Sequence, residues 1–123
     1  MTPSSTTSST ASSTTLISQH CSPAAPALHA DAIDQLLEQL PGWAVIDGAL
    51  QSSFSFRNYY ETIAFVNAMA WVSHQQDHHP DLMVSYKLCA VNYTTHSAKG
   101  ALSMNDFICA AKVSALYVQR AAA

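Results

Sequence analysis

Charged residues are scarce in this chain, and basic ones are the scarcest. Only 11% of the 123 residues are charged, and five basic residues against eight acidic ones give a formal net charge of −3. The basic residues are scattered, whereas a nucleic-acid-binding domain usually presents a basic face. The first of them is Arg57, so the Arg-rich pattern of a mitochondrial address is missing as well. We therefore expect no nucleic-acid partner.

Paired cysteines and long apolar runs are also absent. Cys21, Cys89 and Cys109 lie far apart with no CxxC spacing. An odd number of cysteines without a framework pattern argues against a disulfide scaffold and for a reducing compartment. No apolar run approaches the roughly eighteen residues that a membrane helix needs. We expect no membrane association and a cytoplasmic location.

The first thirty residues differ in composition from the rest. Residues 1–30 are rich in Ser, Thr, Pro and Ala, with too little apolar surface to offset the entropy of ordering. They lack the basic start and apolar core of a secretory signal, whereas Ser/Thr richness leaves a chloroplast address open. The preferred interpretation is a disordered cytoplasmic tail followed by one domain over residues 31–123.

Hydrophobic periodicity predicts the first elements of this domain. Asp31 can cap a short helix that ends at Pro41-Gly42. Strands over 43–46 and 49–56 flank Asp47-Gly48, a pair typical of a two-residue hairpin turn. We therefore expect a helix followed by a β-hairpin.

A second helix, a second hairpin and a third helix follow. Residues 58–76 carry a helical apolar stripe, and Pro80 should end that helix near Asp77 or His78. The stripe comprises Tyr59, Ile63, Val66, Met69, Ala70 and Ser73. Strands over 82–86 and 88–95 precede a helix capped by Ser103, whose inward residues extend to Val118. The predicted fold is α+β, a four-stranded antiparallel sheet with three helices on one face, in the order α-β-β-α-β-β-α. Its exposed edge strands offer a route to dimerisation.

Three of the six histidines lie between Asp77 and Asp106. His78 and His79 fall at the predicted helix–strand corner, and His96 falls at the polar end of a strand. The pKa of histidine lies nearest neutrality, so this cluster indicates proton transfer or metal binding. The same three histidines could also be incidental surface residues.

A metal site is one alternative. His74 and His78 are four residues apart on a predicted helix, with Asp77, Asp81 or His79 nearby. Gln75 follows His74, so HExxH is absent, and thiol ligands are missing too. We therefore favour a site without metal.

The spacing of the motif resembles that of the pterin-4a-carbinolamine dehydratases. Its elements are Asp77-His-His-Pro-Asp81, Tyr86 seven residues after His79, Thr95-His96, and Asp106 at the start of a helix. The resemblance covers about residues 31–120 and includes the preceding order of hairpin and helix. It implies dehydration of 4a-hydroxytetrahydropterin to quinonoid dihydropterin and water, which supports tetrahydrobiopterin recycling for aromatic amino-acid hydroxylases. It further implies that no cofactor is needed and that the chain forms a homodimer or homotetramer.

The resemblance also assigns roles to residues. His78 and His96 would be the acid–base pair, and His79 would chiefly bind the pterin. The supporting or substrate-binding residues would be Asp77, Pro80, Thr95 and Asp106. From the residues alone, Asp106 could also complete a capping box with Ser103, a role compatible with orienting a neighbour.

The chain departs from the family pattern at three places. His74 stands where many members have a carboxylate, and Leu82 stands where an aromatic residue is common. The loop from His96 to Asp106 is one residue longer than usual. Some animal members also act as dimerisation cofactors of a homeodomain transcription factor, so a non-catalytic interaction protein is the second alternative.

Overall fold

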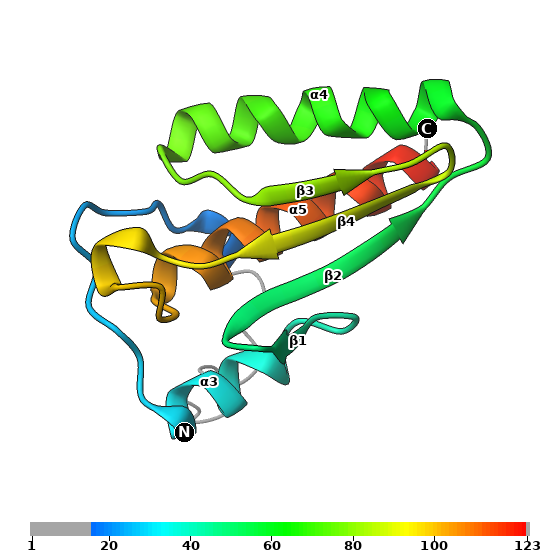
Figure 1. Ribbon diagram of the computed structural model, residues 1–123. Coiled ribbons are helices and arrows are strands. Elements are labelled where there is room, and N and C mark those ends of the chain that lie inside the picture. The colour runs from blue at the N-terminus through cyan, green and yellow to red at the C-terminus, as the bar shows by residue number, and fades with distance from the viewer. Residues whose placement is uncertain (1–15, 123) are drawn as a thin grey trace, which may run out of the picture.

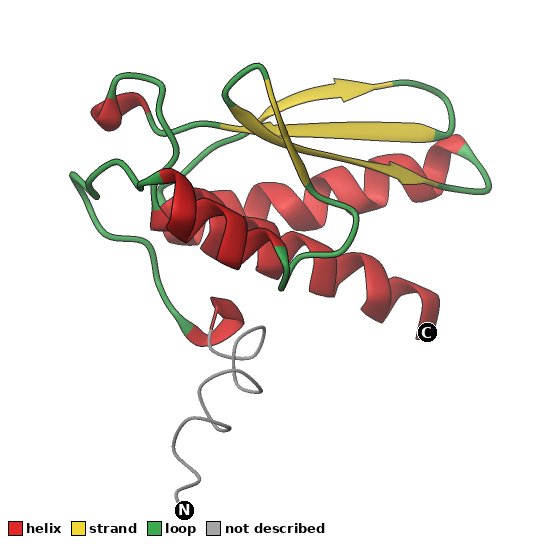
Figure 2. Ribbon diagram, turned by 90° about the horizontal axis from the view of Figure 1, so that it is seen from below, coloured by secondary structure: helices red, strands yellow, loops and turns green. Residues whose placement is uncertain are grey.

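The computed structural model describes residues 16–122, which form an antiparallel sheet with helices packed on one face (Figure 1). In chain order the elements are α3 (Ala30–Leu37), β1 (Ala44–Ile46), β2 (Ala49–Ser55), α4 (Tyr59–Gln76), β3 (Asp81–Val84), β4 (Leu88–Tyr93), the 3-10 turn η1 (His96–Ala98) and α5 (Met104–Ala122). Figure 2 shows the helices on one side of the sheet. The predicted α+β fold is confirmed. None of the helices in this part of the chain is both long and apolar enough to cross a membrane.

The sheet of the described residues has the strand order β1-β2-β4-β3, and every neighbouring pair is antiparallel. The β1–β2 hairpin turns at Asp47 and Gly48, whose φ angles of 52° and 78° are the left-handed values that this tight turn requires. Helix α4 connects β2 to β3, and β4 then returns between those two strands. β1 and β3 are therefore the edge strands.

The core lies between the inner face of the sheet and the helices. Leu50 of β2 and the alternating residues Cys89, Val91 and Tyr93 of β4 are at most 1% exposed. This confirms the alternation predicted for β4. The helices oppose these residues with buried side chains that include Phe65, Met69, Phe107 and Val113.

Helix α4 starts and ends close to the predicted positions. The Asn58 side chain caps it by accepting a hydrogen bond from the Glu61 amide at 2.9 Å. The helix ends at Gln76, and Asp77 follows in the left-handed conformation. Its buried face consists of Thr62, Phe65, Met69 and Ser73. The predicted stripe was wrong in including Tyr59, which is 53% exposed. The buried face is rotated around the helix axis relative to the predicted stripe.

Two smaller expectations at helices were wrong. Asp31 does not cap α3: His29 holds that position, and Asp31 lies in the first turn of the helix. Val118 near the end of α5 is 65% exposed rather than inward, because that side of the helix faces away from the sheet.

Residues 16–28, which we call the strap, pack against the domain. Leu16 is 2% exposed within the core. The Lys112 ammonium donates to the Ile17 carbonyl at 2.6 Å, and the Leu28 amide donates to the Leu102 carbonyl at 2.8 Å. The expectation of disorder over residues 1–30 was therefore wrong for residues 16–28, which pack against the domain. Residues 1–15 of the expected tail lie outside the described residues.

Candidate active site

The three histidines of the motif line one pocket of about 540 Å³. It lies where the end of α4, the end of β4, η1, the start of α5 and the strap meet. Its lining comprises Cys21, Ser22, Pro23, Ala24, Gln75, Gln76, Asp77, His78, His79, Thr94, Thr95, His96, Ser97 and Asn105. His79 and His96 are exposed, whereas the His78 side chain is only 11% exposed. One imidazole is therefore set in the wall, and two stand at the solvent side.

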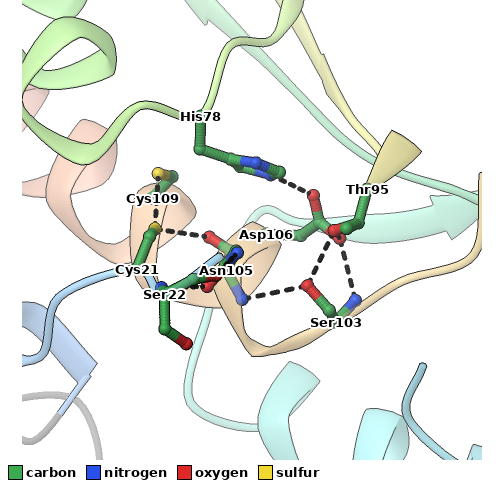
Figure 3. Close-up of polar contacts among 8 residues, drawn as sticks. All are labelled: Cys21, Ser22, His78, Thr95, Ser103, Asn105, Asp106 and Cys109. Atoms are coloured by element: carbon green, nitrogen blue, oxygen red, sulfur yellow. Dashed lines mark hydrogen bonds and ion pairs between the residues drawn. The ribbon is translucent and has the colours of Figure 1, made fainter. Parts of the chain in front are cut away.

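The side chain of Asp106 is held in place by hydrogen bonds with three residues of this site. Its side chain is fully buried, and one carboxylate oxygen lies 2.6 Å from His78 Nε2 (Figure 3). The other oxygen accepts from the Thr95 hydroxyl at 2.7 Å and from the Ser103 amide at 2.9 Å. Buried carboxylates are stable only when such partners replace water. Asp106 thus caps α5 and also holds an imidazole, which are the two compatible roles expected for it.

A second layer of hydrogen bonds orients the Thr95 hydroxyl. Because that hydroxyl gives its proton to Asp106, its 2.7 Å contact with Ser103 makes the Ser103 hydroxyl the donor to Thr95. The Ser103 oxygen in turn accepts from the Asn105 amide at 3.2 Å. All donors in this series of hydrogen bonds therefore point toward the Asp106 carboxylate.

His78 has a pKa above its ordinary value. Burial lowers the pKa of His78, but the hydrogen bond and the negative charge of Asp106 outweigh burial and raise it. Its ring also stacks on Tyr93, with centroids 5.6 Å apart and an angle of 6° between the planes. The site therefore favours a protonated imidazole in one fixed orientation.

The backbone after α4 places the two adjacent histidines in different environments. Asp77 has a φ of 52°, which terminates α4, and the His78 amide donates to the Ser73 carbonyl at 3.2 Å. Pro80 favours extended backbone at His79. The chain consequently turns so that His78 enters the wall while His79 remains exposed.

His96 lies on a 3-10 turn rather than on a strand. β4 ends at Tyr93, two residues before the predicted end, and His96 begins η1. The Thr95 amide donates to the Ala101 carbonyl at 3.0 Å, which closes the segment between them into a loop. Lys99 and Gly100 take left-handed conformations in this loop. The loop presents His96 to the pocket.

Sequence reasoning missed the contribution of the strap and of Asn105. The Asn105 side chain accepts from the Ser22 amide at 3.0 Å and donates to the Ser22 carbonyl at 2.8 Å. The Cys21 amide donates to the Gln76 side chain at 2.7 Å. The strap sequence carries no periodic apolar signal that would have indicated this wall. The position of Asn105 beside Asp106 was the one available hint.

The alternative metal ligands do not assemble. His74 is exposed and does not line the pocket, and the centroid of its ring lies 5.8 Å from that of Trp71. Between residues 16 and 122 the structure has no group of three or more His, Cys, Asp or Glu side chains arranged to hold a metal ion. The arrangement of His78, His79 and His96 instead offers proton donors and acceptors around one cavity.

Comparisons with known proteins point to one family. Residues 26–116 match the family model described as pterin 4 alpha carbinolamine dehydratase. A protein of Nitrosospira multiformis, provisionally named pterin-4-alpha-carbinolamine dehydratase, is 55% identical over 97 residues, covering 79% of this chain and 85% of that protein. A protein of Nitrosomonas eutropha with the same provisional name is 57% identical over 99 residues, covering 80% and 87%.

A solved structure is similar as well. The crystal structure of a transcriptional coactivator/pterin dehydratase from Brucella melitensis superimposes with a TM-score of 0.71 at 27% identity. The match covers 74% of this chain and 98% of that one. The family match spans most of the described domain, including all three histidines and Asp106. The chain therefore belongs to the pterin-4-alpha-carbinolamine dehydratase family.

Proposed function

We propose that this chain dehydrates 4a-hydroxytetrahydropterin to quinonoid dihydropterin and water by histidine acid–base catalysis. The observation that carries the proposal is the pairing of His78 with buried Asp106 in the wall of a pocket that His79 and His96 also line. Membership of the family supplies the substrate class. The cellular role that follows is tetrahydrobiopterin recycling for aromatic amino-acid hydroxylation in the cytoplasm.

The reaction needs one proton donor and one proton acceptor. Loss of water from the carbinolamine requires a proton on the departing 4a-hydroxyl and removal of the proton from the ring nitrogen N5. His78 is the better donor, because Asp106 raises its pKa and favours the protonated form. Its Nε2 is bonded to Asp106, so Nδ1 remains for proton exchange with the ligand.

The other residues take supporting roles in this proposal. His96 accepts the N5 proton and, being exposed, can return it to water. His79 binds the pterin at the solvent side of the pocket. Asp77 and Pro80 set the backbone of the histidine pair, and Thr95 holds Asp106 by its hydroxyl. This scheme uses neither a metal nor another cofactor.

We also propose that the chain forms a homo-oligomer through its β3 edge. All four residues of β3 are exposed, and Leu82, Met83 and Val84 are apolar. An open apolar edge strand is a template for pairing with another strand. A second copy of the same chain would cover it with a self-complementary contact.

A non-catalytic role is the second candidate, because the similar protein from Brucella melitensis is described as both a transcriptional coactivator and a pterin dehydratase. The buried pair of His78 and Asp106 favours catalysis. A surface used only for binding has no need of an imidazole held on a buried carboxylate, which is costly to bury. Catalysis therefore requires the histidines, whereas the binding function does not.

The decisive experiment adds purified protein to freshly generated 4a-hydroxytetrahydropterin and follows quinonoid product by absorbance. We expect acceleration over buffer, and its loss in His96→Ala by about 10²-fold or more while the fold and oligomer persist. His74→Ala is the matched control, since it removes an exposed histidine that does not line the pocket. Equal rates with and without protein would leave only the binding function.

A further inference from the structure

Two cysteine thiols meet beside the pocket, and the acid–base scheme uses neither of them. Cys21 of the strap and Cys109 of α5 are 88 positions apart in the sequence, yet their sulfur atoms are 3.5 Å apart (Figure 3). Cys109 is fully buried, whereas Cys21 is partly exposed and lines the pocket. One thiol is thus open to small reagents and its partner is sheltered directly behind it.

The two thiols have different ionisation tendencies. The hydrogen bond from Cys109 lowers the pKa of Cys21, and the positive charges of His78 and Lys112 act in the same direction. The contact with Cys21 and burial raise the pKa of Cys109. The pair therefore places an accessible thiol of lowered pKa next to a buried thiol that can resolve its oxidised form.

We propose that Cys21 and Cys109 form a peroxide-sensitive dithiol whose disulfide fixes the strap to α5 at the wall of the pocket. The oxidant is hydrogen peroxide. The Cys21 thiolate attacks a peroxide oxygen and breaks the O–O bond, which gives a sulfenic acid at Cys21 and one molecule of water after protonation. The Cys109 sulfur then displaces hydroxide from the Cys21 sulfur, which forms the S–S bond and a second molecule of water. Two electrons pass from the two thiols to the peroxide.

The required movement is small. A disulfide bond is about 2.0 Å long, so the sulfur atoms must approach by roughly 1.5 Å from their present contact. Cys21 belongs to the strap, and the backbone around it is attached by hydrogen bonds from the Cys21 amide to Gln76 and between Ser22 and Asn105. The Cys21 thiol also donates to the Asn105 carbonyl at 3.6 Å. These bonds can adjust without disturbing the sheet. The covalent link would close the long chain segment between the two cysteines and prevent the strap from lifting away from the pocket.

The third cysteine provides an internal control. Cys89 is fully buried on the inner face of β4, and burial raises the pKa of its thiol. It lines neither the pocket nor the contact between Cys21 and Cys109. Peroxide should therefore leave Cys89 reduced.

The experiment oxidises the full reduced chain with a slight excess of hydrogen peroxide, then denatures it and alkylates the remaining thiols. Before alkylation, we expect the mass of the chain to fall by two hydrogen atoms. After alkylation, we expect Cys89 to be the only alkylated cysteine and a linked peptide to join Cys21 to Cys109. Dithiothreitol should restore three alkylated thiols. Hydrogen exchange of strap amides in the oxidised chain should slow by about tenfold or more, while exchange in β2 stays unchanged.

Variants make the outcome independent of catalysis. Cys21→Ser should abolish the linked peptide, and Cys89→Ala should retain it. Circular dichroism checks the fold of each variant, and Cys109→Ala serves as a second test of the pair if it folds. Three alkylated thiols after peroxide would overturn the proposal. So would over-oxidised Cys21 without a link, a disulfide between two chains, or unchanged exchange in the strap.

Discussion

The imidazole of His78 lies flat against the phenol ring of Tyr93, at a centroid distance of 5.6 Å and an angle of 6°. The stacking fixes the plane of the imidazole, and the 2.6 Å bond to Asp106 fixes its rotation within that plane. Tyr93 is fully buried on the inner face of β4. The orientation of the proposed proton donor is therefore set by the sheet and by helix α5 rather than by the loop that carries His78.

Replacing Asp106 by Asn should lower catalysis by roughly 10²-fold, within the usual contribution of a positioned acid. The amide lacks the charge that favours protonated His78, so the pKa of His78 should also fall. Initial rates and an NMR titration of the histidines measure both effects. Asp47→Asn is the matched control, because it makes the same change at an exposed turn of the β1–β2 hairpin. An Asp106→Asn enzyme with the wild-type rate and His78 titration would contradict this role of the carboxylate.

Replacing Thr95 by Val should destabilise the domain by about 1–3 kcal/mol. Thr95 is 2% exposed, and the change removes the hydroxyl that bonds both Asp106 and Ser103. Thr95→Ser keeps the hydroxyl and should lose less stability. Urea unfolding of the three proteins gives the comparison. A Thr95→Val protein as stable as wild type would show that the hydroxyl contributes nothing to stability.

The pair of His78 and Asp106 should make stability depend on pH in a defined direction. Because the pKa of His78 is raised on folding, the folded chain binds more protons than the unfolded chain around and above neutrality. The contribution is fully present below the unfolded pKa of about 6.5 and is lost as pH rises through the folded pKa. The difference in unfolding free energy between wild type and His78→Gln should therefore shrink from pH 6 to pH 9. A difference that grows over this range would reverse the assigned sign.

Placing a charge on the β3 edge should weaken self-association. Met83 is 71% exposed on β3, and Met83→Lys would put a charge where two edges are proposed to pair. We expect the dissociation constant of the oligomer to rise about tenfold or more, which equals about 1.4 kcal/mol. Sedimentation velocity over a concentration series measures this change. Val118→Lys, at a similarly exposed apolar position of α5, is the control. Equal effects of both variants would remove β3 from the proposed interface.

Much of the fold was predictable because its signals are local. Asp47-Gly48 specifies a tight turn by the left-handed conformations it accepts, and Pro80 excludes helix at the residue before it. The alternation of Cys89, Val91 and Tyr93 identified the buried face of β4. The stripe of α4 was less certain because apolar residues occur around much of that helix, including the exposed Trp71.

The site was predictable only in part, for a physical reason. The histidine motif indicated the chemistry, but spacing alone did not rank His78 above His79 and His96. That difference depends on tertiary contacts, namely the buried carboxylate of Asp106 and the ring of Tyr93. The strap was missed because it is attached by a few apolar side chains without regular spacing and by hydrogen bonds to Asn105, Gln76 and Lys112.

The family match begins at residue 26, after the four strap residues that line the pocket, Cys21, Ser22, Pro23 and Ala24. One wall of the cavity is thus made by chain outside the matched region, while the opposite wall carries the histidines. The proposed catalytic histidines and this wall therefore come from separate segments of the chain. Substitutions in these four strap residues would therefore change the shape of the cavity without replacing any of the three histidines or Asp106.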